Sequence, residues 1–272
     1  MSRLIGILNQ RFLLWHRPRR RGDVKAMHQY RIDGGQKIRG TLSIGGAKNA
    51  ILPILAAVCL NKGVSKIHNC PPIADTLTSI SILEKIGCAV QLESTTLTVD
   101  ASASLSHHIP AEMVGKMRSS ILFMGAMLGR CGQVNIAMPG GCKLGARAID
   151  LHLSGLAAMG ATVCIQADKI HCQAPRLKGA NISLHTASVG ATQNLMLAAT
   201  KAHGVTVIQN AAKEPEVVDL ANFLITLGAD IKGAGTSQIS ICGVEELHQP
   251  QATPYTIMPD RIVAGTYLVA AA

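Results

Sequence analysis

The sequence has 272 residues, 48% of them apolar, which is enough to bury one large core or two smaller ones. Only 3% of the residues are aromatic, which argues against a nucleic-acid-binding surface of stacked rings. The formal net charge of +10 is concentrated in residues 1–26, which hold seven Lys and Arg against Asp23 alone. A nucleic-acid-binding domain usually carries its positive charge on the folded part, so this distribution argues against that class of protein. No apolar run is long enough to span a membrane.

Residues 1–26 differ in character from everything that follows, because they are rich in Arg and almost free of acidic residues. We expect a disordered extension here, with Met27 as the natural start. The alternative is a transit peptide or a basic anchor for a membrane or nucleic-acid surface, since Arg-rich amphipathic segments serve both purposes.

From residue 41 onward, short β patterns alternate with helical ones. We expect strands at 41–46, 64–69, 88–94, 133–139, 161–167, 181–186, 205–210, 229–235 and 238–243. Continuous apolar helices are expected at 49–60, 117–129 and 191–202. Amphipathic helices are expected to end at Gly87, Gly160 and Gly228, each in a Leu-x-x-x-Gly sequence with the glycine as left-handed cap.

The chain contains an internal repeat. Pairs of identical residues, each separated by 141 positions, are Gly63 and Gly204, Asn69 and Asn210, Leu83 and Leu224, and Gly87 and Gly228. A third copy of the helix ending, LAAMGATV, lies at 156–163 between them. Such self-similarity predicts an α/β fold of three pseudo-equivalent units, with helices in the core and sheets around them.

Cysteine and histidine spacing gives no sign of a metal or disulfide framework. The eight cysteines form no CxxC pair, and several, such as Cys59 and Cys164, lie in apolar runs where a free thiol behaves as a small hydrophobe. The histidines lack metal-ligand spacing, and neither GxGxxG nor a P-loop is present. We therefore expect no cofactor, no metal and a reducing, cytoplasmic setting.

Cationic residues recur where apolar helices begin. Lys48 and Asn49 follow two glycines and an alanine, Arg118 opens the next helix, and Arg147 and Asp150 precede a third. Helix N-termini attract anions, and Lys and Arg add full charges to the backbone donors. Each residue alone is as well explained by a solvated helix start, but the repeat would bring such ends to one crevice.

Two further motifs have structural explanations that we prefer. Ser188, in SVGAT, is a favoured helix N-cap, although its hydroxyl could also bind a ligand. The acidic residues Glu214, Glu216 and Asp219, in EPEVVD, suit the first turns of a helix and pairing with basic neighbours better than catalysis.

The segment PGGCKLGAR, at 139–147, places Cys142 after two glycines and beside Lys143. Flexible backbone and fixed positive charge expose a thiol and lower its pKa, whereas a buried structural cysteine has apolar neighbours. This setting marks Cys142 as a candidate chemical residue.

Together these segments resemble the UDP-N-acetylglucosamine enolpyruvyl transferase family from about Met27 to Ala272. The resemblance is carried by GGAKNAILPILAA, MRSSI, PGGCKLGARAIDLHLSGL, SVGAT, EPEVVDLANFLITLGA and PDRIVAGTYLVAAA. It implies an enolpyruvyl-transferase domain of three repeated units, an inside-out α/β barrel. It also implies transfer of the enolpyruvyl group from phosphoenolpyruvate to the 3′-hydroxyl of UDP-N-acetylglucosamine, the first committed step of peptidoglycan synthesis.

The resemblance also implies roles for individual residues. Cys142 matches the proton donor to phosphoenolpyruvate, on a loop that Gly140 and Gly141 allow to close, and Lys48 and Arg147 match phosphoenolpyruvate contacts. Nucleotide-sugar contacts are matched by Asn49, Arg118, Arg147, Ala148, Ile149, Asp150, Leu151, Thr186, Ala187, Ser188 and Val189. Thr186 stands where the family commonly has lysine, which implies a weaker diphosphate contact, and Val263 stands where it often has glutamate.

The family has two such domains, and the resemblance implies that this chain holds mainly the first. The expected divisions are first strands at 27–47, a complete first domain at 48–256 and the opening of the second at 257–272. The family's aspartate base and several arginines lie beyond this segment, and Asp260 is no match for that base. Alternatives are a non-catalytic remnant that binds the nucleotide sugar at most, or one half of a split enzyme with a separately encoded C-terminal half.

Overall fold

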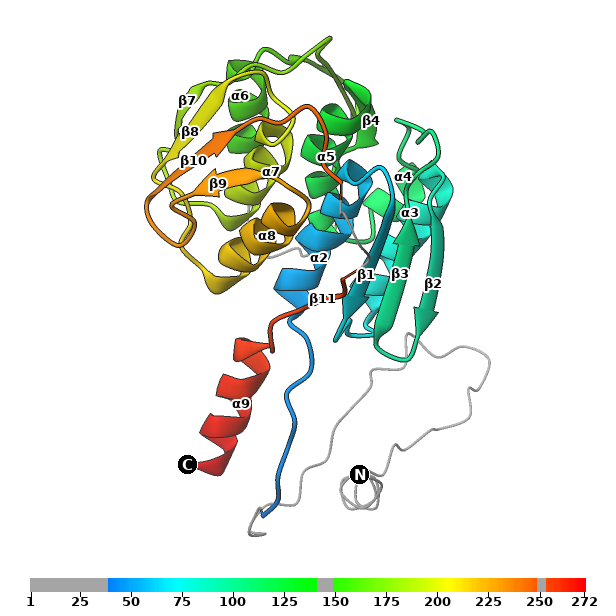
Figure 1. Cartoon of the computed structure of the whole chain (residues 1–272), viewed down its shortest axis with the longest axis vertical. Coiled ribbons are helices and arrows are strands. Elements are labelled where there is room, and N and C mark those ends of the chain that lie inside the picture. The colour runs from blue at the N-terminus through cyan, green and yellow to red at the C-terminus, as the bar shows by residue number, and fades with distance from the viewer. Residues whose placement is uncertain (1–38, 141–148, 249–252) are drawn as a thin grey trace, which may run out of the picture. The chain divides into compact units, whose positions relative to one another are not determined.

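The computed structural model describes residues 39–140, 149–248 and 253–272. These residues divide into two units, Ile44–Val263 and a smaller one that contains 39–43 and 264–272. Helix α9 (Arg261–Ala271) begins in the larger unit, and its remainder belongs to the smaller one. The larger unit holds all the other helices and strands described below (Figure 1).

Three separate sheets form the outside of the larger unit. The first, in the order β11-β1-β3-β2, contains β1 (Val64–His68), β2 (Ala89–Glu93), β3 (Thr96–Asp100) and β11 (Tyr255–Thr256). The second, in the order β4-β6-β5, contains β4 (Gln133–Ala137), β5 (Thr162–Gln166) and β6 (Lys169–Gln173). The third, in the order β7-β8-β10-β9, contains β7 (Asn181–Ser183), β8 (Val205–Gln209), β9 (Asp230–Lys232) and β10 (Gln238–Cys242).

The three sheets share one topology. In each, the first strand of the repeat pairs antiparallel with the third, and the third pairs antiparallel with the second. A short segment also joins the first strand in parallel: β11 on β1, β7 on β8, and a single bridge between His108 and Asn135 on β4. The predicted α/β class with three repeated units is therefore confirmed, and the described strands form three open sheets rather than a closed barrel.

The helices divide into a central set and a connecting set. The central set consists of α2 (Lys48–Ala57) with the 3₁₀ turn η1 (Val58–Leu60), the 3₁₀ turn η2 (Arg118–Ile121) with α5 (Leu122–Cys131), and α7 (Val189–Ala199). The connecting helices are α3 (Ala74–Ile86), α6 (Asp150–Ala158) and α8 (Pro215–Thr226), and α4 (Ala111–Val114) is a single short turn. Figure 1 shows α2, α5 and α7 between the sheets, as the apolar runs predict, because a helix that is apolar all round must be buried.

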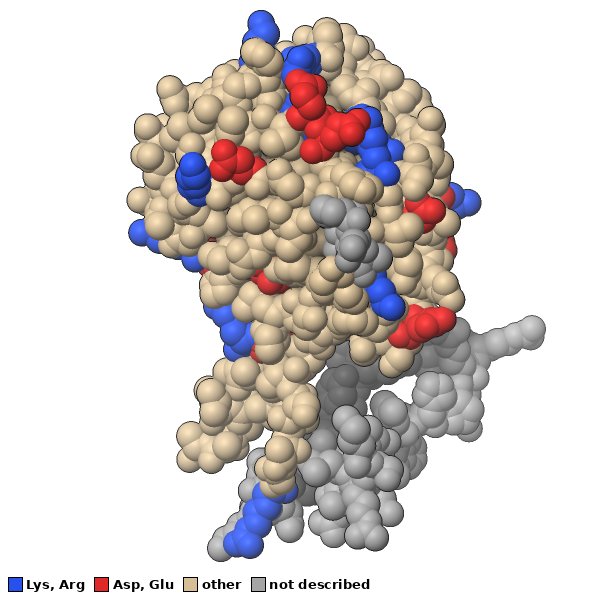
Figure 2. All heavy atoms as spheres, viewed as in Figure 1, with Lys and Arg blue, Asp and Glu red and all other residues tan. Residues whose placement is uncertain are grey.

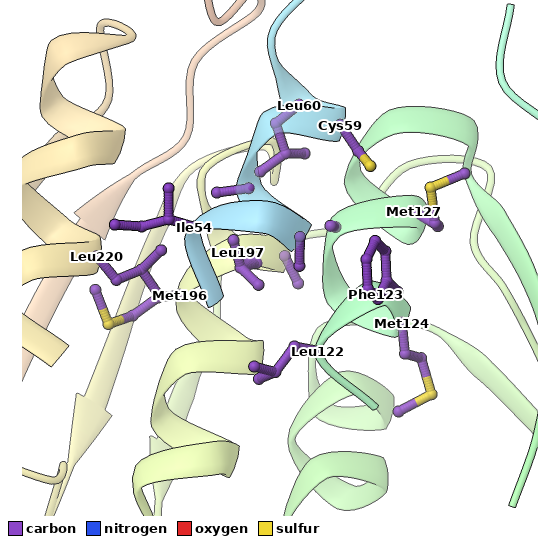
Figure 3. Packing of buried hydrophobic residues seen from close by; sticks show 14 of the residues in the cluster. Ile54, Cys59, Leu60, Leu122, Phe123, Met124, Met127, Met196, Leu197 and Leu220 are labelled. Carbon is purple, nitrogen blue, oxygen red and sulfur yellow. The ribbon is translucent and has the colours of Figure 1, made fainter. Parts of the chain in front are cut away.

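The core lies where these helices meet. Ile54 of α2 packs near Met196 of α7 and Leu220 of α8, while Phe123 of α5 lies in the same cluster (Figure 3). Helices α5 and α7 approach especially closely at Gly125, where an added Cβ would lie 2.2 Å from the backbone oxygen of Asn194. Only glycine permits this packing.

The residues separated by 141 positions occupy equivalent conformations. Gly87 and Gly228 are left-handed, with φ of 113° and 98°, as predicted for helix caps. Asn69 and Asn210 are also left-handed, with φ of 58° and 55°. Each asparagine donates from Nδ2 to a carbonyl that follows the short parallel strand, Asn69 to Ile257 at 3.0 Å and Asn210 to Leu184 at 2.8 Å. The repeat therefore preserves a hydrogen bond that fastens the parallel segment to each sheet.

Two expectations from the sequence are wrong. Residues 41–46 form no strand, and the described residues offer this segment only one bridge, between Gly46 and Pro259. A β pattern without a neighbouring strand edge cannot form a ladder. Cys164 is exposed rather than packed in the core, because β5 is an edge strand on which four of the five residues are exposed, whereas Cys59 is buried as expected.

The surface of the described residues carries mixed charge. Figure 2 shows Lys and Arg side chains interspersed with Asp and Glu rather than gathered into one basic area on that face. None of the helices in the described part of the chain has both the length and the apolar character needed to span a lipid bilayer.

Candidate functional site

A cleft of about 970 Å³ opens in the larger unit where several helices begin. Its walls come mainly from the starts of α2, η2, α6, α7 and α8. The lining residues include Lys48, Asn49, Asp75, Arg118, Ser119, Leu151, His152, Thr186, Ala187, Ser188, Val189, Gly190, Gln193, Glu214, Glu216 and Arg261. Helix N-termini present unpaired N–H groups and the positive end of the helix dipole. The cleft is therefore suited to an anionic ligand, and the repeat explains why equivalent helix ends converge.

Lys48 lies at the first position of α2 with its ammonium in the cleft. Its Nζ is 2.6 Å from Asp75 Oδ2, and both side chains are partly exposed. Such a pair holds the ammonium in place without burying it, and a ligand phosphate could compete with the carboxylate for the charge.

Asp260 has a structural role that fits its exclusion as a catalytic base. Its Oδ1 accepts from the backbone N–H groups of Ile262, at 2.9 Å, and Val263, at 3.0 Å, which caps the start of α9. Its Oδ2 accepts the backbone N–H of Lys48 at 3.2 Å. One carboxylate thus satisfies donors at the beginnings of two helices.

Ser188 serves as the N-cap of α7, as the sequence predicts. Its Oγ accepts the backbone N–H of Ala191 at 3.3 Å, and the residue also lines the cleft. Because Oγ acts as an acceptor in the cap, the hydroxyl can still donate its hydrogen, and capping is compatible with ligand binding.

The acidic motif at the start of α8 makes structural contacts through Glu216 and Asp219, whereas Glu214, the N-cap residue, makes no side-chain capping bond. Glu216 is 3% exposed, and its two carboxylate oxygens accept from Arg261 Nε at 2.9 Å and Nη2 at 3.2 Å. This paired geometry neutralises the buried charge and fixes the guanidinium at the rim of the cleft. Asp219 accepts from the hydroxyl of Tyr255 at 2.7 Å. The predicted pairing of this motif with basic neighbours is confirmed for Glu216.

His152 is a cleft residue that the sequence analysis did not single out. It lies on α6 and is 5% exposed, and its Nδ1 is 3.0 Å from Nδ2 of Asn194 on α7. The pKa of the imidazole falls to about 4, mainly because burial disfavours its charged form; the Arg118 charge also lowers the pKa, and Asp150 raises it. His152 is therefore neutral at physiological pH. The only signal in the sequence is a histidine two residues after Asp150 at an expected helix start.

The structure brings together most of the predicted site residues that it describes. Lining the cleft are Lys48, Asn49, Arg118, Leu151, Thr186, Ala187, Ser188 and Val189. Ile149 is buried just before α6, and the exposed Asp150 starts that helix, lies near His185 and is not among the lining residues. Cys142, Arg147 and Ala148 lie outside the described residues.

The family of the chain follows from comparison with known proteins. Residues 32–272 match the family model described as EPSP synthase (3-phosphoshikimate 1-carboxyvinyltransferase), and the chain belongs to this family. It is 52% identical over 246 residues to a UDP-N-acetylglucosamine 1-carboxyvinyltransferase 2 of Caldanaerobacter subterraneus subsp. tengcongensis, over 90% of this chain and 58% of the relative. A protein of the same name from Carboxydothermus hydrogenoformans is 45% identical over 245 residues, with the same coverage.

Solved structures agree with this placement. The enolpyruvyl transferase NikO from Streptomyces tendae is similar with a TM-score of 0.76 and 29% identity, over 87% of this chain and 56% of that one. EPSP synthase from Acinetobacter baumannii shares the fold, with a TM-score of 0.70 and 20% identity over 88% of this chain and 54% of that one. The chain thus spans a little over half the length of the proteins it matches.

Proposed function

We propose that the cleft binds UDP-N-acetylglucosamine and phosphoenolpyruvate and contributes to enolpyruvyl transfer to the 3′-hydroxyl of the sugar. The observation that carries this proposal is the convergence of Lys48, Arg118 and the N-terminus of α7 on one cleft. Diphosphate, carboxylate and phosphate groups are the anions that such a donor set favours. The relatives named above carry the same activity in their names.

The chemistry can be assigned to residues by their match to the family. The 3′-oxygen bonds to C2 of phosphoenolpyruvate as its proton passes to the base, while Cys142 gives a proton to C3. Loss of a C3 proton and of phosphate from C2 then restores the double bond as an enol ether. Lys48 and Arg147 would neutralise the leaving phosphate, which is electrostatic stabilisation of the developing charge.

Arg118 and the segment Thr186–Val189 would hold the nucleotide sugar. A planar guanidinium suits bidentate contact with a diphosphate, and Ser188, Val189 and Gly190, at the start of α7, line the cleft where a helix N-terminus favours anions. With Thr186 in place of lysine, the backbone and Arg118 carry a larger share of that contact.

The base and further arginines would come from a segment equivalent to the rest of the relatives, in the same polypeptide or in a separately encoded half. The proposed pathway is peptidoglycan synthesis in the cytoplasm, with its consequences for cell shape and division. A role limited to binding the nucleotide sugar is the alternative.

Phosphate release from phosphoenolpyruvate, measured on adding UDP-N-acetylglucosamine, separates these two functions. Release by the purified chain that requires the nucleotide sugar and is lost in Cys142→Ala supports catalysis by this chain. If no phosphate is released while the nucleotide sugar still binds, the catalytic proposal for this chain fails and only the binding function stands.

A further inference from the structure

A chain of hydrogen bonds runs from the core to the cleft through Asn194 and His152. The Oδ1 of Asn194 accepts the backbone N–H of Gly125 at 2.8 Å. Its Nδ2 lies 3.0 Å from Nδ1 of His152. Asn194 is fully buried and His152 nearly so, which means that bulk water cannot substitute for either contact.

The first of these bonds fixes the chemistry of the second. A backbone N–H can only donate, so the atom of Asn194 that faces Gly125 must be the carbonyl oxygen. The amide NH₂ group therefore faces His152 and, since it too can only donate, Nδ1 of the imidazole must be an acceptor without a proton. The proton of the neutral ring consequently lies on Nε2.

Nε2 lies beside Gly190, in the first turn of α7. A Cβ added to Gly190 would be 3.4 Å from Nε2 and 3.3 Å from Cε1, and both His152 and Gly190 line the cleft. Among the hydrogen bonds between described residues, His152 has its one partner on Nδ1. With Nδ1 occupied by Asn194, the Nε2–H beside Gly190 is the donor that the ring can offer to a ligand in the cleft.

We propose that Asn194 is a positioning residue that holds His152 as a neutral Nε2–H donor for a phosphate oxygen of the bound nucleotide sugar. This inference rests on the proposed function for the identity of the ligand. The donor adds to the Ser188–Gly190 amides, and it does so without titrating.

The charges around the ring favour this neutral state. The positive charge of Arg118, on η2, disfavours protonation of the imidazole and so lowers its pKa. Asp150, on α6 with His152, raises the pKa by a smaller amount. Helix α7, which packs against α6, contains no charged residue. His152 is therefore assigned a binding role rather than that of a general acid or base.

The test begins with long-range ¹H–¹⁵N correlation spectra of the wild-type chain, which report the imidazole tautomer directly. We expect the Nε2–H tautomer of His152 from pH 5.5 to 8 in the free protein. Adding inorganic phosphate, and separately UDP-N-acetylglucosamine, should shift the Nε2–H resonance. An Nδ1–H tautomer, or a resonance that neither probe moves, overturns the inference. A shift with phosphate but no binding of the nucleotide sugar supports the donor and counts against the proposed function.

A variant tests whether Asn194 imposes this state. In Asn194→Asp the carboxylate can accept both the backbone N–H of Gly125 and an N–H at Nδ1 of His152. The neutral imidazole then favours the Nδ1–H tautomer, which leaves Nε2 without a proton. Affinity for UDP-N-acetylglucosamine should fall about tenfold at pH 8 and recover as the ring becomes protonated, whereas the wild-type affinity stays flat. Asn210→Asp, the same change at an asparagine outside the cleft, should keep the wild-type tautomer and profile. Equal profiles for the two variants would contradict a positioning role, and the wild-type spectra decide the matter if Asn194→Asp does not fold.

Discussion

Replacing Gly125 by alanine tests the packing that carries both the core and the cleft. The added Cβ would lie 2.2 Å from the backbone oxygen and 2.6 Å from Oδ1 of Asn194. Ordinary contact requires α5 and α7 to separate by about 1 Å. Overpacking of this kind costs about 1–3 kcal/mol, and weakening of the Gly125 to Asn194 hydrogen bond adds about 1 kcal/mol. A helix-propensity gain of about 1 kcal/mol offsets part of this loss. We expect Gly125→Ala to lower the free energy of unfolding by about 1–3 kcal/mol.

Gly129→Ala, one turn later in α5, is the matched control. Its added Cβ would meet Leu60 Cδ2 at 3.0 Å and Lys201 Cγ at 3.2 Å, which are side-chain atoms that can move. We expect its stability to stay within about 1 kcal/mol of wild type, because the gain in helix propensity is the same. Urea unfolding followed by circular dichroism measures both variants. A Gly125→Ala variant as stable as Gly129→Ala would refute the close-packing explanation.

Three further predictions concern stability. Folding lowers the pKa of His152 from 6.5 to about 4, so between these pH values the unfolded chain binds more protons than the folded one. The free energy of unfolding should therefore keep its full His152 contribution above about pH 6.5 and decline towards pH 4. Urea titrations should show this decline to be about 3 kcal/mol smaller in His152→Gln, and parallel curves would exclude His152 as its source. Ser188→Ala should cost about 1 kcal/mol through loss of the α7 cap, and an unchanged urea midpoint would remove that role. Asn69→Ala and Asn210→Ala should each lower the free energy of unfolding by about 2 kcal/mol. Glycine at either position should restore about half of this loss, because glycine tolerates positive φ. Equal losses for alanine and glycine would argue against backbone strain at these positions.

The repeat made most of the fold predictable from the sequence. Gly87 and Gly228 are identical because both adopt a left-handed backbone conformation, and the same conformation explains the identity of Asn69 and Asn210. The three central helices could also be predicted, because a helix that is buried on all sides is apolar on every face and appears in the sequence as a continuous apolar run. Convergence of the helix starts then followed from the pseudo-symmetry.

What could not be predicted depends on contacts between distant segments. The strand expected at 41–46 has an adequate local pattern but, among the described residues, no ladder to join. Cys164 lies in an apolar run, yet it is exposed because β5 is an edge strand with mostly exposed residues. The Gly125–Asn194–His152 chain joins three helices through hydrogen bonds of long sequence separation. Such a network leaves no periodic trace in the sequence.

Calorimetric titration of the chain with UDP-N-acetylglucosamine tests the central claim, that the helix starts form a nucleotide-sugar site, most directly. Arg118→Ala removes a cation from the cleft, while Arg176→Ala removes a surface arginine that pairs with Glu245 and does not line it. We predict that the wild type and Arg176→Ala bind alike and that Arg118→Ala binds about ten- to a hundredfold more weakly. No binding by the wild type, or equal affinity for both variants, would contradict the proposed site.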